Sequence, residues 1–462
     1  MSFKDCSIPS CIWQALVLDP LCIKCQRRFC YHHHNKHECL VIKKGSAKDW
    51  YEPETSQLLA LLDSKLIKAE VERLRPGCTA HEIQIPADWK AFANLFRGSF
   101  NFHLKIDFED GQSWIMRIRR RVGREYCDQA LRYNLASEVA TNQALHQAGL
   151  AVPNAIARPE DSQLHPKLIY CYQSFLPGDT WQPFTDPRIR ELPLSSTSAT
   201  HIRSIARWFL AMEKVTFDKV GSPISVSHSS PPAQEIAVGP LVGRHPAYTI
   251  PPYYQGPFRT AKDRWLSTID NKVSLILSHE YCKPKDQIVW YLLLAETRSL
   301  VEQCREMNDT GPFYIRHDDD RFDHIKASAD GEVAGIIDWE WAYTTNKEEA
   351  FAAPNGFVPA EYHKGKNDVL SVREIALMDA YIAQGRLDLA NIVKNGRKYH
   401  RLVDLFRNSR PGILIINALE RSFLGLQDDY PGQPTTIVEW IEVKQLKYQD
   451  DQNLKDLLRG AV

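Results

Sequence analysis

The sequence predicts an α+β protein with two lobes, the first rich in strands and the second mainly helical. Three observations support this: a β-hairpin pattern near residues 96–118, helical periodicity through most of the second half, and a strand–turn–strand pattern at 313–342. The 462 residues are enough for two or three domains with buried cores. A small cysteine-rich module is expected to precede the two lobes.

The composition disfavours several classes of function. Lys plus Arg (57) balance Asp plus Glu (57), so no general attraction to nucleic acid or an anionic membrane is implied. No apolar run approaches the ~20 residues of a membrane helix, and the first residues do not resemble a secretory signal. We therefore expect a cytoplasmic protein without membrane contact, with the nucleus as the open alternative, and cysteines present as thiols or metal ligands.

The amino-terminal module holds six of the 11 cysteines within its first 39 residues. Close Cys and His pairs provide eight ligands, enough for two tetrahedral zinc sites. One ion would take Cys6, Cys11, Cys30 and His33, and the other Cys22, Cys25, His37 and Cys39. Metal would supply much of the folding energy of so short a segment. His32 and His34 flank His33, so the ligand within this triplet stays open, and the alternative is buried thiols beside solvated histidines.

The first lobe is expected to follow a linker and an amphipathic helix within residues 43–88. That helix would place apolar side chains on one face and end near Pro76-Gly77; they are Leu58, Leu61, Leu62, Leu66 and Val71. Asp110-Gly111 is a favoured turn for the hairpin that follows. A helix at about 130–148 and a strand at 168–175 complete this part of the prediction.

The second lobe is expected to be helical. Thr200 can cap a first helix, Ser371 with Glu374 forms a capping box for a later one, and further helices are expected around 259–278 and 284–308. Residues 221–260 are rich in Pro, Gly and Tyr, which predicts a long irregular excursion.

The acidic segment 313–342 contains the candidate catalytic residues. A strand-like start leads to His317-Asp318-Asp319, and Asp330-Gly331 joins two further strand-like runs, the second ending just before Asp338. We expect the two carboxylates, Asp319 and Asp338, at the ends of neighbouring strands. Phosphoryl transfer needs such a pair, one acid to orient an attacking hydroxyl and one to hold magnesium on the nucleotide.

Residues 89 to about 425 resemble the aminoglycoside phosphotransferase and choline kinase-like family, in particular its fungal members. The matching stretches are Arg97-Gly98-Ser99-Phe100-Asn101, Trp114-Ile115-Met116-Arg117-Ile118, Ser137-Glu138-Val139-Ala140-Thr141, Phe175-Leu176-Pro177-Gly178, Gly239-Pro240-Leu241-Val242 and the acidic segment. The resemblance implies a two-lobed protein-kinase-like fold, with an N-lobe at 89–178 and a C-lobe at 179–462. Within the predicted module, 1–42, residues 6 to 39 resemble the AN-one type zinc finger, which implies a structural role and a protein partner.

The family resemblance also implies roles for single residues. Asp319 would orient and deprotonate the acceptor hydroxyl, His317 would buttress the loop, and Asp338 would bind the magnesium ion that bridges the phosphates of ATP. The cofactor-binding residues would be Gly98, Ser99 and Phe100 in the loop over the nucleotide, Arg117 paired with Glu138, and His324. Apart from the resemblance, the cluster from Arg119 to Arg124 is expected to form a solvated rim rather than an anion site and is assigned no role.

His324 stands where the resembled family has asparagine. A neutral imidazole can bind a divalent ion, but magnesium prefers oxygen ligands. Three alternatives stay open: His324 contacts a phosphate, Asp320 or Asp323 supplies the missing oxygen, or phosphoryl transfer is lost.

Two functions follow from these residues. The first is an ATP- and magnesium-dependent phosphotransferase acting on a hydroxyl of a small molecule. The second is a kinase-like binding protein with impaired catalysis that is recruited through its zinc finger. A third class, nucleic-acid binding by the zinc finger, is disfavoured because the head is short and its charge is mixed.

Overall fold

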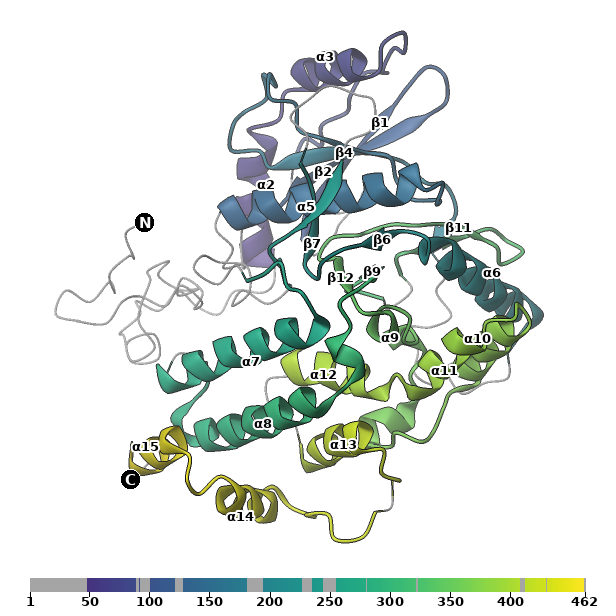
Figure 1. Cartoon of the computed structure of the whole chain (residues 1–462). Coiled ribbons are helices and arrows are strands. Elements are labelled where there is room, and N and C mark those ends of the chain that lie inside the picture. The colour runs from purple at the N-terminus through teal and green to yellow at the C-terminus, as the bar shows by residue number, and fades with distance from the viewer. Residues whose placement is uncertain are drawn as a thin grey trace, which may run out of the picture. The chain divides into compact units, whose positions relative to one another are not determined.

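The computed structural model describes residues 48–88, 91, 100–120, 128–180, 194–226, 235–243, 255–279, 281–320, 323–407, 412–428 and 430–460. These described residues fall into two compact units, one within 48–143 and 153–176 and the other within 144–152, 177–248 and 253–460. Figure 1 labels their helices and strands. The α+β class is confirmed, with a β-rich part and a helical part. No described helix is long and apolar enough to cross a membrane.

Several predicted site residues lie outside the described part of the chain. They are the eight proposed zinc ligands (Cys6, Cys11, Cys22, Cys25, Cys30, His33, His37 and Cys39) and two residues of the predicted nucleotide loop (Gly98 and Ser99). Their roles therefore stay predictions.

The first unit is built on an antiparallel sheet with the strand order β1-β2-β4-β3. Its strands are β1 (Asn101–Asp107), β2 (Ser113–Arg119), β3 (Ala155–Ala157) and β4 (Tyr170–Ser174). The hairpin of β1 and β2 is confirmed, and Gly111 in its turn has a φ of 81°. Positive φ is a conformation that glycine adopts at little cost, so the Asp-Gly signal located this turn correctly.

Three helices accompany this sheet: α2 (Lys48–Leu59), α3 (Ser64–Leu74) and α5 (Asp128–Gln147), of which residues 128–143 belong to the first unit. The prediction of one continuous helix up to Pro76 was wrong, because Asp63 starts a new one. Its side chain accepts hydrogen bonds from the backbone N–H groups of Lys65 and Leu66. Ile67 and Val71 are buried in the core of this unit, whereas Leu66 is exposed.

The second unit holds three small antiparallel sheets, ordered β11-β10-β5, β12-β9-β6 and β7-β8. Their strands are β5 (Asp179–Thr180), β6 (Thr216–Phe217), β7 (Ser222–Ser225), β8 (Ile236–Gly239), β9 (Phe313–Arg316), β10 (Ile325–Ala327), β11 (Val333–Ile336) and β12 (Tyr343–Thr345). Two predictions need correction. Asp319 and Asp338 follow strands of different sheets, β9 and β11, and the region 221–260 contains the regular hairpin of β7 and β8.

The helices of the second unit are α6 (Ser196–Met212), α7 (Ala261–Leu277), α8 (Pro284–Gln303), α9 (Lys347–Ala350), α10 (Val372–Ile382), α11 (Leu387–Asn395), α12 (Arg397–Arg407), α13 (Ile413–Leu424), α14 (Ile437–Lys447) and α15 (Gln452–Gly460), with short 3-10 turns η3 (Glu306–Asn308), η4 (Asn355–Phe357) and η5 (Ala360–Lys364). Ser195 caps α6 in place of the predicted Thr200. The capping box of Ser371 and Glu374 is confirmed. Figure 1 shows α7 and α8 lying side by side.

Helix α6 fixes the β10–β11 hairpin. His201 of α6 has its Nδ1 2.8 Å from the carbonyl oxygen of Gly331. The rings of Trp208 and Trp339 stack with their centroids 5.7 Å apart, and both are buried in the main core of the unit. The hairpin that leads to Asp338 is therefore held at its turn and at its far end.

Gly331 provides a test of this packing, because its φ is 90° and a Cβ there would lie 2.6 Å from the carbonyl oxygen of Thr197. Gly385, between α10 and α11, has a φ of 73° with nothing within 4 Å. We expect Gly385→Ala to cost about 1–2 kcal/mol of stability through backbone strain alone, and Gly331→Ala to cost clearly more. Urea denaturation would measure both, and equal losses would contradict close packing at Gly331.

Candidate active site

Strand β9 delivers the loop that carries Asp319, and Arg316 at its end anchors that loop. Nη2 of Arg316 donates to Oδ2 of Asp320 over 2.7 Å. Nη1 of the same guanidinium donates to the carbonyl oxygens of Glu349 and Ala352, at 2.8 and 2.9 Å. One buried guanidinium thus ties the loop to the chain around α9. The same guanidinium pairs with Asp320, which the sequence analysis named as one alternative oxygen ligand for the metal ion.

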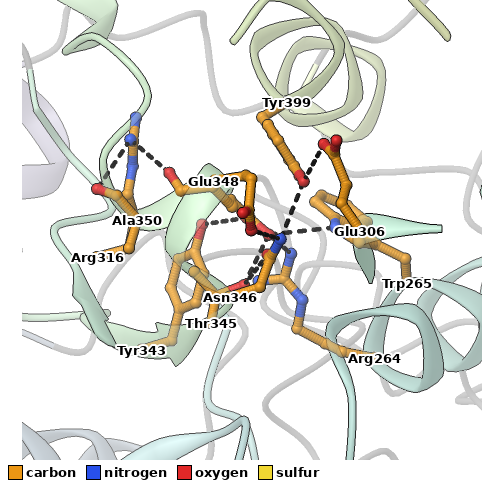
Figure 2. A network of polar contacts seen from close by, with 11 residues as sticks. Arg264, Trp265, Glu306, Arg316, Tyr343, Thr345, Asn346, Glu348, Ala350 and Tyr399 are labelled. Carbon is orange, nitrogen blue, oxygen red and sulfur yellow. Dashed lines mark hydrogen bonds and ion pairs between the residues drawn. The ribbon is translucent and has the colours of Figure 1, made fainter. Parts of the chain in front are cut away.

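Helix α9 is fixed in turn by a buried polar network, drawn in Figure 2. Nη2 of Arg264 lies 2.7 Å from both carboxylate oxygens of Glu349, and the hydroxyls of Tyr343 and Thr345 donate to the same carboxylate at 2.9 and 2.8 Å. Burial disfavours the ionised form of Glu349, but Arg264 and these hydroxyls outweigh it and hold its pKa below the usual value. Removal of one partner from a buried ion pair typically lowers protein stability by about 3–5 kcal/mol. The contacts at the base of the loop are therefore costly to break.

His317 bridges the two loops that carry the acidic residues. The backbone N–H of Asp319 donates to Nδ1 of His317 over 3.2 Å, and Nε2 of His317 lies 3.1 Å from the carbonyl oxygen of Ile337. Both bonds form only when Nδ1 is bare and Nε2 carries the proton, which is a neutral imidazole. Burial, reinforced by His324, lowers the pKa of His317 to about 3, which agrees with this form. Asp338 and Asp319 both act on that pKa in the opposite direction, so both lie near the ring.

The loop of Asp338 has an unusual backbone. Asp338 and Trp341 both have a φ of 66°, in the left-handed region that residues other than glycine rarely adopt. Such conformations cost of order 1–3 kcal/mol each and persist where the surroundings enforce them. Trp339, between them, is buried and donates from Nε1 to the carbonyl oxygen of Ile336 over 3.1 Å. The strain is thus located at the residue predicted to bind the metal.

His324 lies beside the bridge formed by His317. The two imidazole rings stack with centroids 4.0 Å apart and an angle of 21°. The backbone N–H of Ile337 donates to the carbonyl oxygen of His324 over 2.9 Å, so His324 is opposite the residue that precedes Asp338. The structure therefore brings four predicted site residues together in the second unit: His317, Asp319, His324 and Asp338.

In the first unit, the predicted ion pair of Arg117 and Glu138 is confirmed, with Nε 3.0 Å from Oε1. Arg119 joins it, because its Nη2 lies 2.8 Å from Oε2 of the same carboxylate. Gln173 donates from Nε2 to Oε1 of Glu138 over 2.9 Å. Both guanidinium groups are buried and share the carboxylate of Glu138.

The prediction that Arg119 and its neighbours form a solvated rim was wrong for the part described. Arg120 is also buried, pairs with Glu54 at 2.8 Å and lies over the ring of Phe102 at 5.0 Å. Sequence reasoning missed Arg119, although its alternation with Arg117 along β2 places the two side chains on the same face. Phe100, the described residue of the predicted nucleotide loop, is half-buried immediately before β1.

Within the described residues, no group of three or more His, Cys, Asp and Glu side chains could hold a metal ion by itself. An ion at Asp338 would therefore take further ligands, such as water or the oxygens of a bound molecule. Magnesium bound with nucleotides commonly uses one or two protein carboxylates together with phosphate oxygens, so this acidic site is compatible with a nucleotide-borne ion.

Comparisons with known proteins give structural similarity only, since no family model and no curated protein matches the chain. The structure is similar to a macrolide 2'-phosphotransferase type I, with 16% identity over 81% of this chain and 97% of that one, and a TM-score of 0.37. An ethanolamine kinase of Plasmodium vivax has 14% identity over 73% and 82% of the two chains, with a TM-score of 0.39. An amicoumacin kinase, solved with AMP-PNP and Ca²⁺, has 11% identity over 86% and 97%, with a TM-score of 0.36.

The neutral bridge of His317 predicts a pH dependence of stability. The pKa of His317 is about 3 in the fold and about 6.5 in the unfolded chain, so between these values only the unfolded chain binds the proton. The contribution of His317 is therefore complete above pH 6.5 and falls with pH by up to about 1.4 kcal/mol per unit. We expect His317→Gln to be less stable than the native protein at pH 7, by a difference that shrinks towards pH 4.

Urea denaturation across this pH range measures the difference. His146→Gln, at an exposed position of α5, is the matched control and should behave like the native protein. A stability loss in His317→Gln that stays constant with pH would contradict the neutral bridge.

Proposed function

We propose that the chain is an ATP-dependent phosphotransferase that transfers the γ-phosphoryl group to a hydroxyl of a small molecule. The observation that carries the proposal is the His317 bridge, because one neutral imidazole holds the backbone of Asp319 and the residue before Asp338 in place. Phosphoryl transfer depends mainly on positioning and charge neutralisation, and a fixed pair of carboxylates supplies both. The family resemblance of the sequence supports the same reaction.

Asp319 is the proposed base. Its carboxylate orients the acceptor hydroxyl and takes its proton as the hydroxyl oxygen bonds to the γ-phosphorus, while the bond from that phosphorus to the bridging oxygen breaks and ADP leaves. His317 is a positioning residue, since both of its ring nitrogens are occupied by backbone groups.

Asp338 is the proposed ligand of a divalent ion bound with the nucleotide. That ion would neutralise the phosphate charge, and the left-handed backbone at Asp338 fixes the direction in which the carboxylate leaves the chain. Arg117 is assigned to the phosphates, with Glu138 orienting it and Arg119 supporting Glu138. Phe100, with Gly98 and Ser99, is assigned to the loop over the nucleotide.

His324 also favours a second function, a kinase-like binding protein without turnover that is recruited through its cysteine-rich head. An imidazole in place of an amide oxygen removes a ligand that magnesium prefers. The two functions are separated by His324→Asn. ATP turnover that appears only in the substituted protein would identify the native chain as a binding protein.

Substitution of the two acids should give different losses. Asp338→Asn is expected to abolish metal-dependent binding of AMP-PNP, because it removes the anionic ligand of the ion. Asp319→Asn should keep that binding and lower the rate of ATP turnover by about 10²–10⁴-fold, the usual contribution of a general base. Calorimetry and ADP release measure the two effects.

Asp330→Asn is the matched control, since Asp330 is an exposed carboxylate in the turn of the same hairpin. It should change neither property. Negligible nucleotide binding by the native protein and Asp338→Asn alike would rule out the enzyme.

A further inference from the structure

His324 occupies a defined place next to the proposed ion. The hydrogen bond from Ile337 N–H to its carbonyl oxygen extends the β10–β11 ladder beyond the pair Ile325 and Ile336. His324 is therefore opposite Ile337, one residue before Asp338. This backbone bond holds residue 324 next to the start of the Asp338 loop, whether or not that loop binds a ligand.

The imidazole of His324 carries a nitrogen that the described protein does not satisfy. The side chain is 6% exposed, and its Nδ1 is buried without a hydrogen-bond partner among the described residues. The carboxylate of Asp323 lies 3.9 Å from Nδ1, beyond hydrogen-bond range, and its side chain is 56% exposed. A buried polar atom without a partner is unfavourable, so this nitrogen favours an additional partner, such as a bound ion or a water molecule.

The neighbouring imidazole cannot serve in its place. Both ring nitrogens of His317 are occupied, by the backbone N–H of Asp319 and the carbonyl oxygen of Ile337. His317 instead supports one face of His324 through the stack at 4.0 Å, which restricts the rotation of that ring. The two histidines therefore have separate tasks: His317 holds the loops, and His324, which lies opposite Ile337, offers a buried nitrogen.

We propose that His324 is a nitrogen ligand of the nucleotide-bound ion, and that the site consequently prefers a first-row transition ion, Mn²⁺, to Mg²⁺. This rests on the proposed nucleotide site at Asp338. Mg²⁺ demands oxygen ligands, whereas transition ions accept imidazole together with carboxylate and phosphate oxygens. His324 then adapts the site to a different ion, and its presence is compatible with turnover.

Electron spin-echo spectroscopy of the native protein with Mn²⁺ and AMP-PCP, an ATP analogue whose phosphate bridge contains no nitrogen, tests the proposal directly. Coupling of Mn²⁺ to ³¹P reports that the ion sits on the nucleotide, and coupling to ¹⁴N reports a histidine ligand. We expect both in the native protein. Labelling of histidine with ¹⁵N should convert the nitrogen signal to that of ¹⁵N, which assigns it without any substitution.

Substituted proteins then assign the nitrogen to one residue. His324→Asn should lose the ¹⁴N coupling and keep the ³¹P coupling, whereas the surface control His146→Asn should keep both. Calorimetry with AMP-PNP should show the ratio of Mn²⁺ to Mg²⁺ affinity falling about tenfold or more in His324→Asn, a change equivalent to about 1.4 kcal/mol.

The outcomes separate this inference from the proposed function. A ³¹P coupling without ¹⁴N coupling in the native protein would overturn the role of His324 and leave the nucleotide site intact, as expected if His324 contacts a phosphate or pairs with Asp323. Persistence of the ¹⁴N signal in His324→Asn would overturn it equally. Absence of both couplings in the native protein would overturn the proposed function as well.

Discussion

The neutral imidazole of His317 is the contact on which the candidate site depends. Its two ring nitrogens serve two different loops, one that follows β9 and one that follows β11, and these strands belong to different sheets. The pairing of the described strands does not by itself bring Asp319 and Asp338 to the same place. Burial keeps the ring neutral, and neutrality lets Nδ1 accept while Nε2 donates. A protonated ring would lose the bond to Asp319.

The rigidity of this arrangement comes from the polar network beneath it. Arg264 of α7 holds Glu349 in α9, and the carbonyl oxygens at the end of α9 hold Arg316, which holds Asp320. Each partner in this series is buried, so each would be costly to leave without its counterpart. A loop fixed at both ends by such contacts can keep a carboxylate in position for a reaction that relies on orientation.

Features that depend on local chemistry could be predicted from the sequence. The Asp110-Gly111 hairpin, the Ser371–Glu374 capping box and the pairing of Arg117 with Glu138 are all present. Prediction failed where distant residues decide the outcome. The ion pair of Arg264 and Glu349 joins positions 85 residues apart and has no local signal. Asp63 is an exception, because its capping signal is local, but periodicity alone extends the helical pattern past it. Arg119 was predicted to be exposed, whereas it is buried against Glu138, 19 residues further along the chain.

The position of the ion is the central claim of this account, since Asp319, Asp338, His317 and His324 are all interpreted relative to it. Anomalous diffraction from a crystal of the protein with Mn²⁺ and AMP-PNP measures that position directly. The account predicts a manganese peak about 2.0–2.3 Å from a carboxylate oxygen of Asp338 and from phosphate oxygens of the nucleotide. Bound nucleotide with no manganese at Asp338, or manganese bound at another place, would contradict it.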